Sequence, residues 1–273
     1  MHLDVAELRR FYYRTHLGQL AQRSIRASLQ GHWKDVKGAN FAGFGFAAPF
    51  LRPYKDKALR TLSLMPAEQG AFHWPMEAPN ISVLAQERRW PLATGFLDRL
   101  IIAHALENSE RPKVILAEAQ RVLAPGGRAL VITPNRTGLW ARTDQTPFGH
   151  GRPFSVEQVE RLLRSFSLEP ISHSAALYFP PSPRKYWLKS AGMWERAGRG
   201  LDAQRLAGAI IVEVEKNGLR CPSGGGRGIR ARTAGGLRRA SRPQTQTDSR
   251  QRRSGVWRLK RLNRRDQQQA GFP

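Results

Sequence analysis

The most informative stretch of the sequence is Leu123-Ala-Pro-Gly-Gly-Arg-Ala-Leu-Val-Ile-Thr-Pro-Asn135. Its leucine closes an apolar helical stripe, and the Pro-Gly-Gly that follows predicts a tight turn, because glycine accepts the positive φ of a sharp reversal. Residues 129–132 are then an apolar run, typical of a strand covered on both faces. Ligands of open α/β sheets bind at the carboxyl ends of such strands, so a ligand site is expected near Asn135.

Strand and helix patterns alternate on both sides of this stretch. Apolar runs predict strands near residues 39–47, 58–64, 81–85, 98–103, 168–177 and 208–215. Helical spacing predicts one long helix over residues 4–30 and others over 111–123, 155–166 and 187–199. The Val-Glu alternation near residue 213 favours an edge strand partly facing water. We therefore expect an α/β fold, a doubly wound, mostly parallel sheet of about seven strands with helices on both faces.

Charge divides the chain unevenly. The net charge is +24, and residues 217–273 contribute +13 of it, from 15 Lys and Arg against 2 Asp and Glu. This segment has no hydrophobic period, which predicts a disordered basic tail. We expect three parts: residues 1–31 as an N-terminal helix, 32–216 as the main domain and 217–273 as the tail. The tail's Arg/Gly-rich, Lys-poor composition also fits translation from a shifted reading frame, which the coding DNA would decide.

Several classes of protein are disfavoured by composition. The single cysteine, Cys221, excludes an internal disulfide and a Cys-rich zinc site, and it fits a reducing compartment. The histidines show no metal-ligand spacing, so no metal is expected. The sequence lacks a signal-peptide pattern and an apolar run of about 20 residues, so we expect a cytoplasmic protein with no membrane partner.

Five short motifs follow one another along the chain: Pro91-Leu92, Gly95-Phe-Leu-Asp-Arg99, His104-Ala-Leu-Glu107, Arg121-Val-Leu-Ala-Pro-Gly-Gly127 and Pro134-Asn135. This ordered set resembles the second half of a class I S-adenosylmethionine-dependent methyltransferase. Their order and spacing are similar to the small-molecule branch, and the resemblance covers about residues 30–216. The loop over residues 134–153 and Met65-Pro-Ala67 look similar to an uncharacterised bacterial subgroup. The resemblance implies a Rossmann-like methyltransferase fold with S-adenosylmethionine as the cofactor.

The resemblance also indicates cofactor-binding residues. The family's first-strand loop reads acidic-x-Gly-x-Gly-x-Gly, and here Phe41 stands at the acidic position and the glycine positions hold Gly43, Gly45 and Ala47. Met65 stands where the family places an acid for the ribose. The predicted cofactor contacts are Gly43, Phe44, Gly45, Ala47, Met65, Glu87 and His104.

Each of these residues also has a purely structural interpretation. The glycines would otherwise form a tight packing turn. Phe44 and Phe46 could attract a sulfonium by cation–π contact, but core packing is favoured for at least one of them. Glu87, or Gln86 beside it, stands where the family often places a polar residue near the adenine, but could equally lie in a solvated loop, and His104 could be a satisfied structural histidine.

The long loop after the opening stretch is the predicted acceptor site. Its candidate side chains are Arg136, Trp140, Arg142 and His150, with Arg152 nearby. Arginine binds carboxylate or phosphate with two hydrogen bonds, and the indole offers a flat wall. The alternative is a loop held by its own hydrogen bonds. Methyl transfer from a sulfonium needs alignment and exclusion of water more than a base, so the catalytic residue stays unassigned.

Three functions are compatible with these patterns. The favoured one is methyl transfer from S-adenosylmethionine to a small-molecule acceptor. The second is a non-catalytic methyltransferase-like module for binding or regulation. The third is an RNA-associated protein that uses its basic tail, because clustered Lys and Arg attract phosphates.

Overall fold

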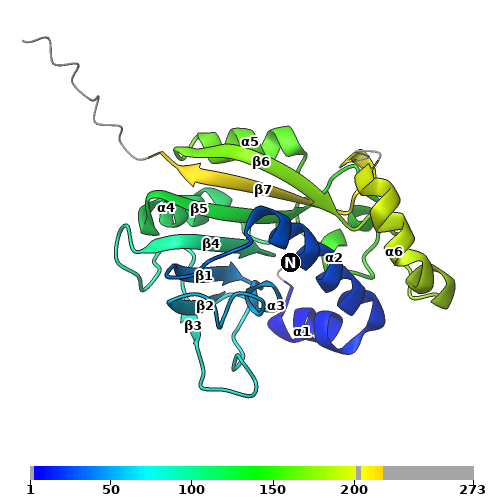
Figure 1. Cartoon of the computed structure of the whole chain (residues 1–273), viewed down its shortest axis with the longest axis horizontal. Helices are drawn as coiled ribbons and strands as arrows, with labels where there is room; N and C mark the ends of the chain where they lie inside the picture. The colour runs from blue at the N-terminus through cyan, green and yellow to red at the C-terminus, as the bar shows by residue number, and fades with distance from the viewer. Residues whose placement is uncertain (1–2, 201–203, 218–273) are drawn as a thin grey trace, which may run out of the picture. The chain divides into compact units, whose positions relative to one another are not determined.

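The computed structural model describes residues 3–200 and 204–217. The predicted tail, residues 217–273, lies outside the described residues except for Asn217. The described part forms a central sheet with helices on both faces (Figure 1). Its strands are β1 (Asn40–Gly45), β2 (Arg60–Pro66), β3 (Ser82–Ala85), β4 (Leu97–Ala103), β5 (Leu123–Pro134), β6 (Leu168–Ala176) and β7 (Ala209–Lys216). Its helices are α1 (Val5–Arg14), α2 (His16–His32), α3 (Ala48–Leu51), α4 (Pro112–Val122), α5 (Val156–Arg164) and α6 (Lys185–Gly200), with short 3-10 turns at Leu139–Arg142, Pro147–Gly149 and Gln204–Leu206.

The sheet confirms the predicted seven-stranded, doubly wound architecture. The strand order is β3-β2-β1-β4-β5-β7-β6. The first five strands are parallel, and β7 runs antiparallel to both β5 and β6. Successive strands are added to one side of β1 up to β3 and then to its other side from β4, so the strand order switches between β1 and β4, where ligands of open α/β sheets bind.

The strand β7 corrects one expectation, because it lies inside the sheet rather than at its edge. Its Glu213 does not face water: the carboxylate accepts hydrogen bonds from the Trp33 indole (2.8 Å) and the Ser172 hydroxyl (2.9 Å) and lies 3.2 Å from His32 Nδ1. A polar residue in a strand marks exposure only when no buried partner satisfies it.

The N-terminal helix also differs from prediction. The single helix expected over residues 4–30 is two helices, because Thr15 is extended (φ −108°, ψ 141°) and caps the second one by accepting from Gly18 N at 3.0 Å. A Cβ on Gly18 would lie 2.0 Å from the carbonyl oxygen of Phe11, so only glycine permits this close approach of α1 to α2. Hydrophobic spacing alone does not reveal such a corner.

The stretch from Leu123 to Asn135 forms the expected buried strand, but not the separate turn expected before it. The helix α4 ends at Val122 and β5 begins at Leu123, so Gly126, with φ +74°, lies within the strand. Leu130 and Ile132 join the core on the α1–α2 face, whereas Ala129 and Val131 join the core on the other face. Fully burying a side chain of this kind stabilises the fold by about 1.5–3 kcal/mol for the larger residues, so this strand anchors both layers.

Candidate functional site

The carboxyl ends of β1 and β4 meet around the predicted glycine positions. Gly45 ends β1 with φ +82°, and the next backbone N–H, of Phe46, donates to Ala103 O at 2.8 Å. A Cβ on Gly45 would lie 2.2 Å from that same oxygen. Gly43 lies inside β1, where a Cβ would lie 2.6 Å from the Cβ of Ala47. Packing of β1 against its neighbours therefore accounts for both glycines.

His104 follows β4 and lies at the centre of a buried polar cluster. Its backbone is left-handed (φ 51°), which is uncommon for a residue with a side chain. Its Nε2 lies 2.6 Å from the Tyr12 hydroxyl, and its Nδ1 lies 3.1 Å from Glu107 Oε1. Gln69 donates to its carbonyl oxygen at 2.8 Å. Tyr12, Gln69, His104 and Glu107 are all buried, and we call these four residues the His104 cluster.

The cluster has a defined hydrogen-bond polarity. The Glu107 carboxylate can only accept, so it fixes the imidazole proton on Nδ1 and leaves Nε2 to accept from the Tyr12 hydroxyl. Burial, with the charge of Glu107 adding to it, raises the pKa of Tyr12 well above its usual value, so the phenol stays a donor. Within the described structure, Glu107 Oε2 has no hydrogen-bond partner. The arrangement is a base nitrogen oriented by a carboxylate.

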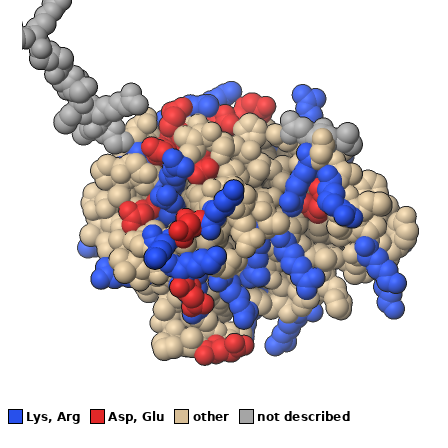
Figure 2. Space-filling model, in the orientation of Figure 1, with Lys and Arg blue, Asp and Glu red and all other residues tan. Residues whose placement is uncertain are grey.

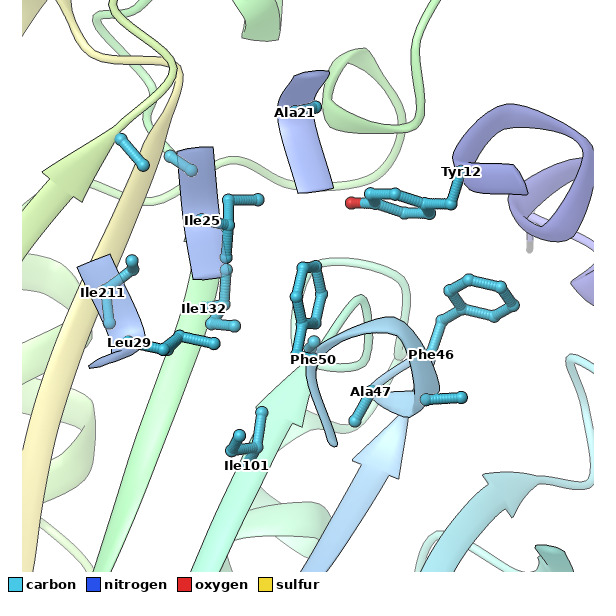
Figure 3. Close-up of a cluster of buried hydrophobic side chains, with 14 of the residues drawn as sticks. Tyr12, Ala21, Ile25, Leu29, Phe46, Ala47, Phe50, Ile101, Ile132 and Ile211 are labelled. Carbon is cyan, nitrogen blue, oxygen red and sulfur yellow. The ribbon is translucent and has the colours of Figure 1, made fainter. Parts of the chain in front are cut away.

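Aromatic rings enclose this base. Tyr12 stacks on Phe46 with centroids 5.7 Å apart and meets Phe50 edge-on at the same distance, while Phe148 packs edge-on against His104 at 4.9 Å. Figure 3 shows Tyr12, from α1, lying over Phe46 and Phe50. Phe44 is different: it joins the core on the other face of the sheet and stacks on Trp90 at 4.3 Å.

A pocket of about 410 Å³ opens beyond the ends of β2 and β3, and its lining includes Glu68, the sequence neighbour of Gln69 in the cluster. Glu68, Gln86, Glu87 and Glu110 are among its lining residues. The predicted contact Glu87 lies here and accepts from the Ser109 hydroxyl at 2.8 Å. Met65, another predicted contact, is buried in β2, two residues before Ala67, which lines the pocket.

Sequence reasoning missed three acidic or aromatic residues of this region. Glu68 lies two residues beyond the end of β2, close to where the family's ribose acid is expected. A search for an acid a few residues after the strand would have found it. Glu107 appeared only as part of a family motif. Tyr12 carried no signal, because its position on a separate N-terminal helix is a tertiary property.

The predicted acceptor loop packs over the His104 cluster, but its side chains are dispersed. Trp140 is fully buried and donates from its indole to Phe179 O at 2.7 Å. Arg136 and Arg142 are exposed, and Arg136 lines a separate pocket of about 480 Å³. His150 Nε2 lies 3.0 Å from Asp144 O.

The loop joins the cluster through other atoms. The Phe148 ring contacts His104, and the backbone N–H of Arg152 donates to Glu107 O at 2.8 Å. The loop therefore helps to enclose the base. Among the residues that the structure describes, there is no group of three or more side chains able to hold a metal ion. Nor does this part of the chain contain a helix long and apolar enough to cross a membrane.

Comparisons with known proteins agree on the fold. The model of a methyltransferase domain family matches residues 64–131, which run from β2 into β5. A methyltransferase structure from Thermotoga maritima is 16% identical, with a TM-score of 0.54, over 78% of this chain and 96% of that chain. One from Archaeoglobus fulgidus is 15% identical, with a TM-score of 0.52, over 78% and 100%. One from Mesorhizobium loti is 14% identical, with a TM-score of 0.51, over 69% and 96%. Each of the three is described as dependent on S-adenosylmethionine, and comparison with curated proteins gave no match.

Proposed function

We propose that this chain, which has the class I methyltransferase fold and a methyltransferase-domain match over residues 64–131, methylates a small-molecule acceptor with S-adenosylmethionine as donor. The observation that carries the proposal is the His104 cluster. In this cluster, His104 Nε2 is a buried base nitrogen, oriented by Glu107, at the carboxyl ends of the central parallel strands. That edge is where an open α/β sheet receives its ligands.

The pocket beyond β2 and β3 fits the adenosine half of the cofactor. Glu68 and Glu87 supply carboxylates that accept hydrogen bonds from ribose hydroxyls or an exocyclic amine. Glu68 thereby supplies the acid that Met65 does not. Gly43 in β1, Ala47 in the turn after β1 and Met65 in β2 are buried beneath this edge of the sheet and would support the bound cofactor from below.

The sulfonium half belongs toward Gly45 and Phe46, because an aromatic face attracts a cation. Tyr12 covers Phe46 in this structure, so α1 must shift before a ligand reaches that ring. When bound, the cofactor supplies an electrophilic methyl group on a sulfonium. Phe44 supports the opposite face of the sheet in this arrangement.

The chain's own residues then act on the acceptor. The Tyr12 hydroxyl now donates to His104 Nε2, in the position that an acceptor's O–H or N–H would take. Nε2 would receive the acceptor's proton, and the Glu107 carboxylate would stabilise the imidazolium. General-base assistance of this kind contributes about 10²–10⁴-fold. The rings of Phe46 and Phe148 would exclude water.

The predicted acceptor loop would also contribute to acceptor binding under this proposal. Arg136, Arg142 and His150 stay candidates for binding an acidic group of the acceptor, because their side chains are exposed or half-buried. Trp140 supports the loop from within instead of touching the acceptor.

Calorimetric titration of the whole chain with S-adenosylhomocysteine tests the proposal. We expect saturable binding that Glu68→Gln weakens, and that Glu169→Gln, at an exposed carboxylate outside the pocket, leaves unchanged. An absence of heat at millimolar ligand would sink the enzyme proposal. If neither Glu68→Gln nor Glu87→Gln changes the affinity for S-adenosylhomocysteine, this pocket does not hold the adenosine.

A further inference from the structure

The helix α6 is held to the domain along a single stripe. Its buried residues are Ala191, Glu195 and Gly198, spaced three and four apart on one face. Glu195 accepts from the backbone N–H of Tyr178 at 2.8 Å, and a Cβ on Gly198 would lie 2.2 Å from the Tyr178 ring. Leu188 also packs against the core, and the opposite side of the helix is turned away from it.

That outward surface carries large apolar side chains. Tyr186 is 72% exposed, Met193 57% and Trp194 38%. The Trp187 ring links the aromatic residues, with centroids 5.2 Å from Tyr186 and 5.9 Å from Trp194. Residues seven apart lie on one line of a helix, so Tyr186 and Met193 form one row, and Trp187 and Trp194 form the next.

The same surface is strongly basic. Four exposed cations lie on or directly before α6, namely Arg184, Lys185, Lys189 and Arg196, whereas Arg199 is bound to Glu195 at the edge of the buried stripe. The segment's carboxylate, Glu195, is buried and pairs with Arg199 at 3.2 Å. The neighbouring helix α2 packs against α6, and Figure 2 shows Lys and Arg spread over the side on which α1, α2 and α6 lie in Figure 1.

We propose that this outward surface of α6 docks on the headgroup region of an anionic lipid bilayer. Tryptophan and tyrosine favour the membrane interface, because their rings are apolar and their polar atoms stay hydrated. Lysine and arginine beside them bind anionic headgroups. A surface-lying helix presents this combination, with an apolar row flanked by cations. The proposed contact is peripheral and departs from the sequence-based expectation of no membrane partner; the described residues contain no helix able to span a bilayer.

Two other occupants fit less well. A nucleic acid would stack bases on separate open rings, whereas the rings of Tyr186, Trp187 and Trp194 pack on one another. A second copy of the chain, docked through the same surface, would bring cations against cations, and like charges repel. Charge complementarity therefore selects an anionic surface.

Vesicle sedimentation of the whole chain tests this proposal. The probe is vesicles of phosphatidylcholine with phosphatidylglycerol, compared with pure phosphatidylcholine. Met193→Ser should weaken binding to the anionic vesicles about ten-fold, because it removes an apolar anchor. Met76→Ser is the matched control: Met76 is 62% exposed and lies outside α6. Both variants keep the rest of the chain, so its own attraction to lipid is the same in each.

The charge contribution has its own pair of variants. Lys189→Ala should weaken binding about five-fold, and Lys57→Ala, at an exposed lysine remote in sequence from α6, should leave it unchanged. Equal vesicle affinities for Met193→Ser and Met76→Ser would overturn the proposal. It is also overturned if Met193→Ser weakens binding to a short RNA but not to vesicles, or if it dissociates a dimer in sedimentation velocity without affecting vesicle binding.

Discussion

The hydrogen bond between Tyr12 and His104 yields the sharpest prediction. Tyr12→Phe keeps the ring that stacks on Phe46 and meets Phe50, but it removes the hydroxyl that lies 2.6 Å from Nε2. The imidazole nitrogen is then buried without a partner. Leaving one buried group unsatisfied costs about 1–3 kcal/mol.

That cost is large enough to measure. A domain of this size loses about 2–4 °C in Tm for each kcal/mol, so Tyr12→Phe should unfold about 2–12 °C below the native chain. Differential scanning calorimetry provides the measurement.

Tyr54 provides a control that the chain itself offers. Its hydroxyl is also buried, which raises its pKa to about 12, yet no partner for it is found among the described residues. Tyr54→Phe therefore removes a polar atom without breaking a hydrogen bond and should leave Tm unchanged or raise it. Equal losses in the two variants would refute the reasoning, since the Tyr12 bond would then contribute nothing beyond the hydroxyl itself.

Two further predictions concern Glu213 in β7 and Gly45 at the end of β1. Although burial acts to raise the pKa of Glu213, hydrogen bonds from His32, Trp33 and Ser172 lower it to about 2, from an ordinary value of 4.5. The ionised Glu213 therefore adds about 3 kcal/mol to the free energy of unfolding above pH 4.5, and this contribution is lost as the pH falls toward 2. Glu213→Gln should flatten the loss of stability at acidic pH, measured by denaturant unfolding across a pH series. An unchanged pH dependence would contradict the lowered pKa. Gly45→Ala should destabilise the fold by more than about 2 kcal/mol, because a Cβ there meets the Ala103 carbonyl; a variant with native Tm would show that β1 and β4 can separate at this point.

Most of the fold could be predicted because its signals are local. A buried parallel strand is a short apolar run, and a capping box is visible as Ser155 and Gln158, whose reciprocal hydrogen bonds measure 3.3 and 3.0 Å. Two errors share one cause. The break at Thr15 depends on Gly18 meeting another helix, and the burial of Glu213 depends on partners far away in sequence. Periodicity contains no information about such contacts.

The candidate site was harder to predict for the same reason. His104 was identified because its motif places it at the end of a strand, and Glu87 because it follows another. The base nitrogen's partner comes from α1, 92 residues away in sequence. Trp140 resembled an exposed acceptor wall because a loop is usually at the surface, but a Cβ on Gly208 would meet its ring at 2.3 Å, and this glycine lets the indole enter the core.

The Tyr12–His104 bond connects stability to ligand access under the proposed function. The hydroxyl satisfies the base nitrogen while the site is closed, so an acceptor reaches Nε2 only when α1 releases it. Binding must then offset about 1–3 kcal/mol, which reduces apparent affinity by about 5- to 150-fold. An acceptor that offers its own O–H or N–H recovers most of this cost, because it satisfies the same nitrogen. An acceptor without such a group leaves Nε2 unpaired in an apolar enclosure, so the closed site itself discriminates between the two kinds of molecule.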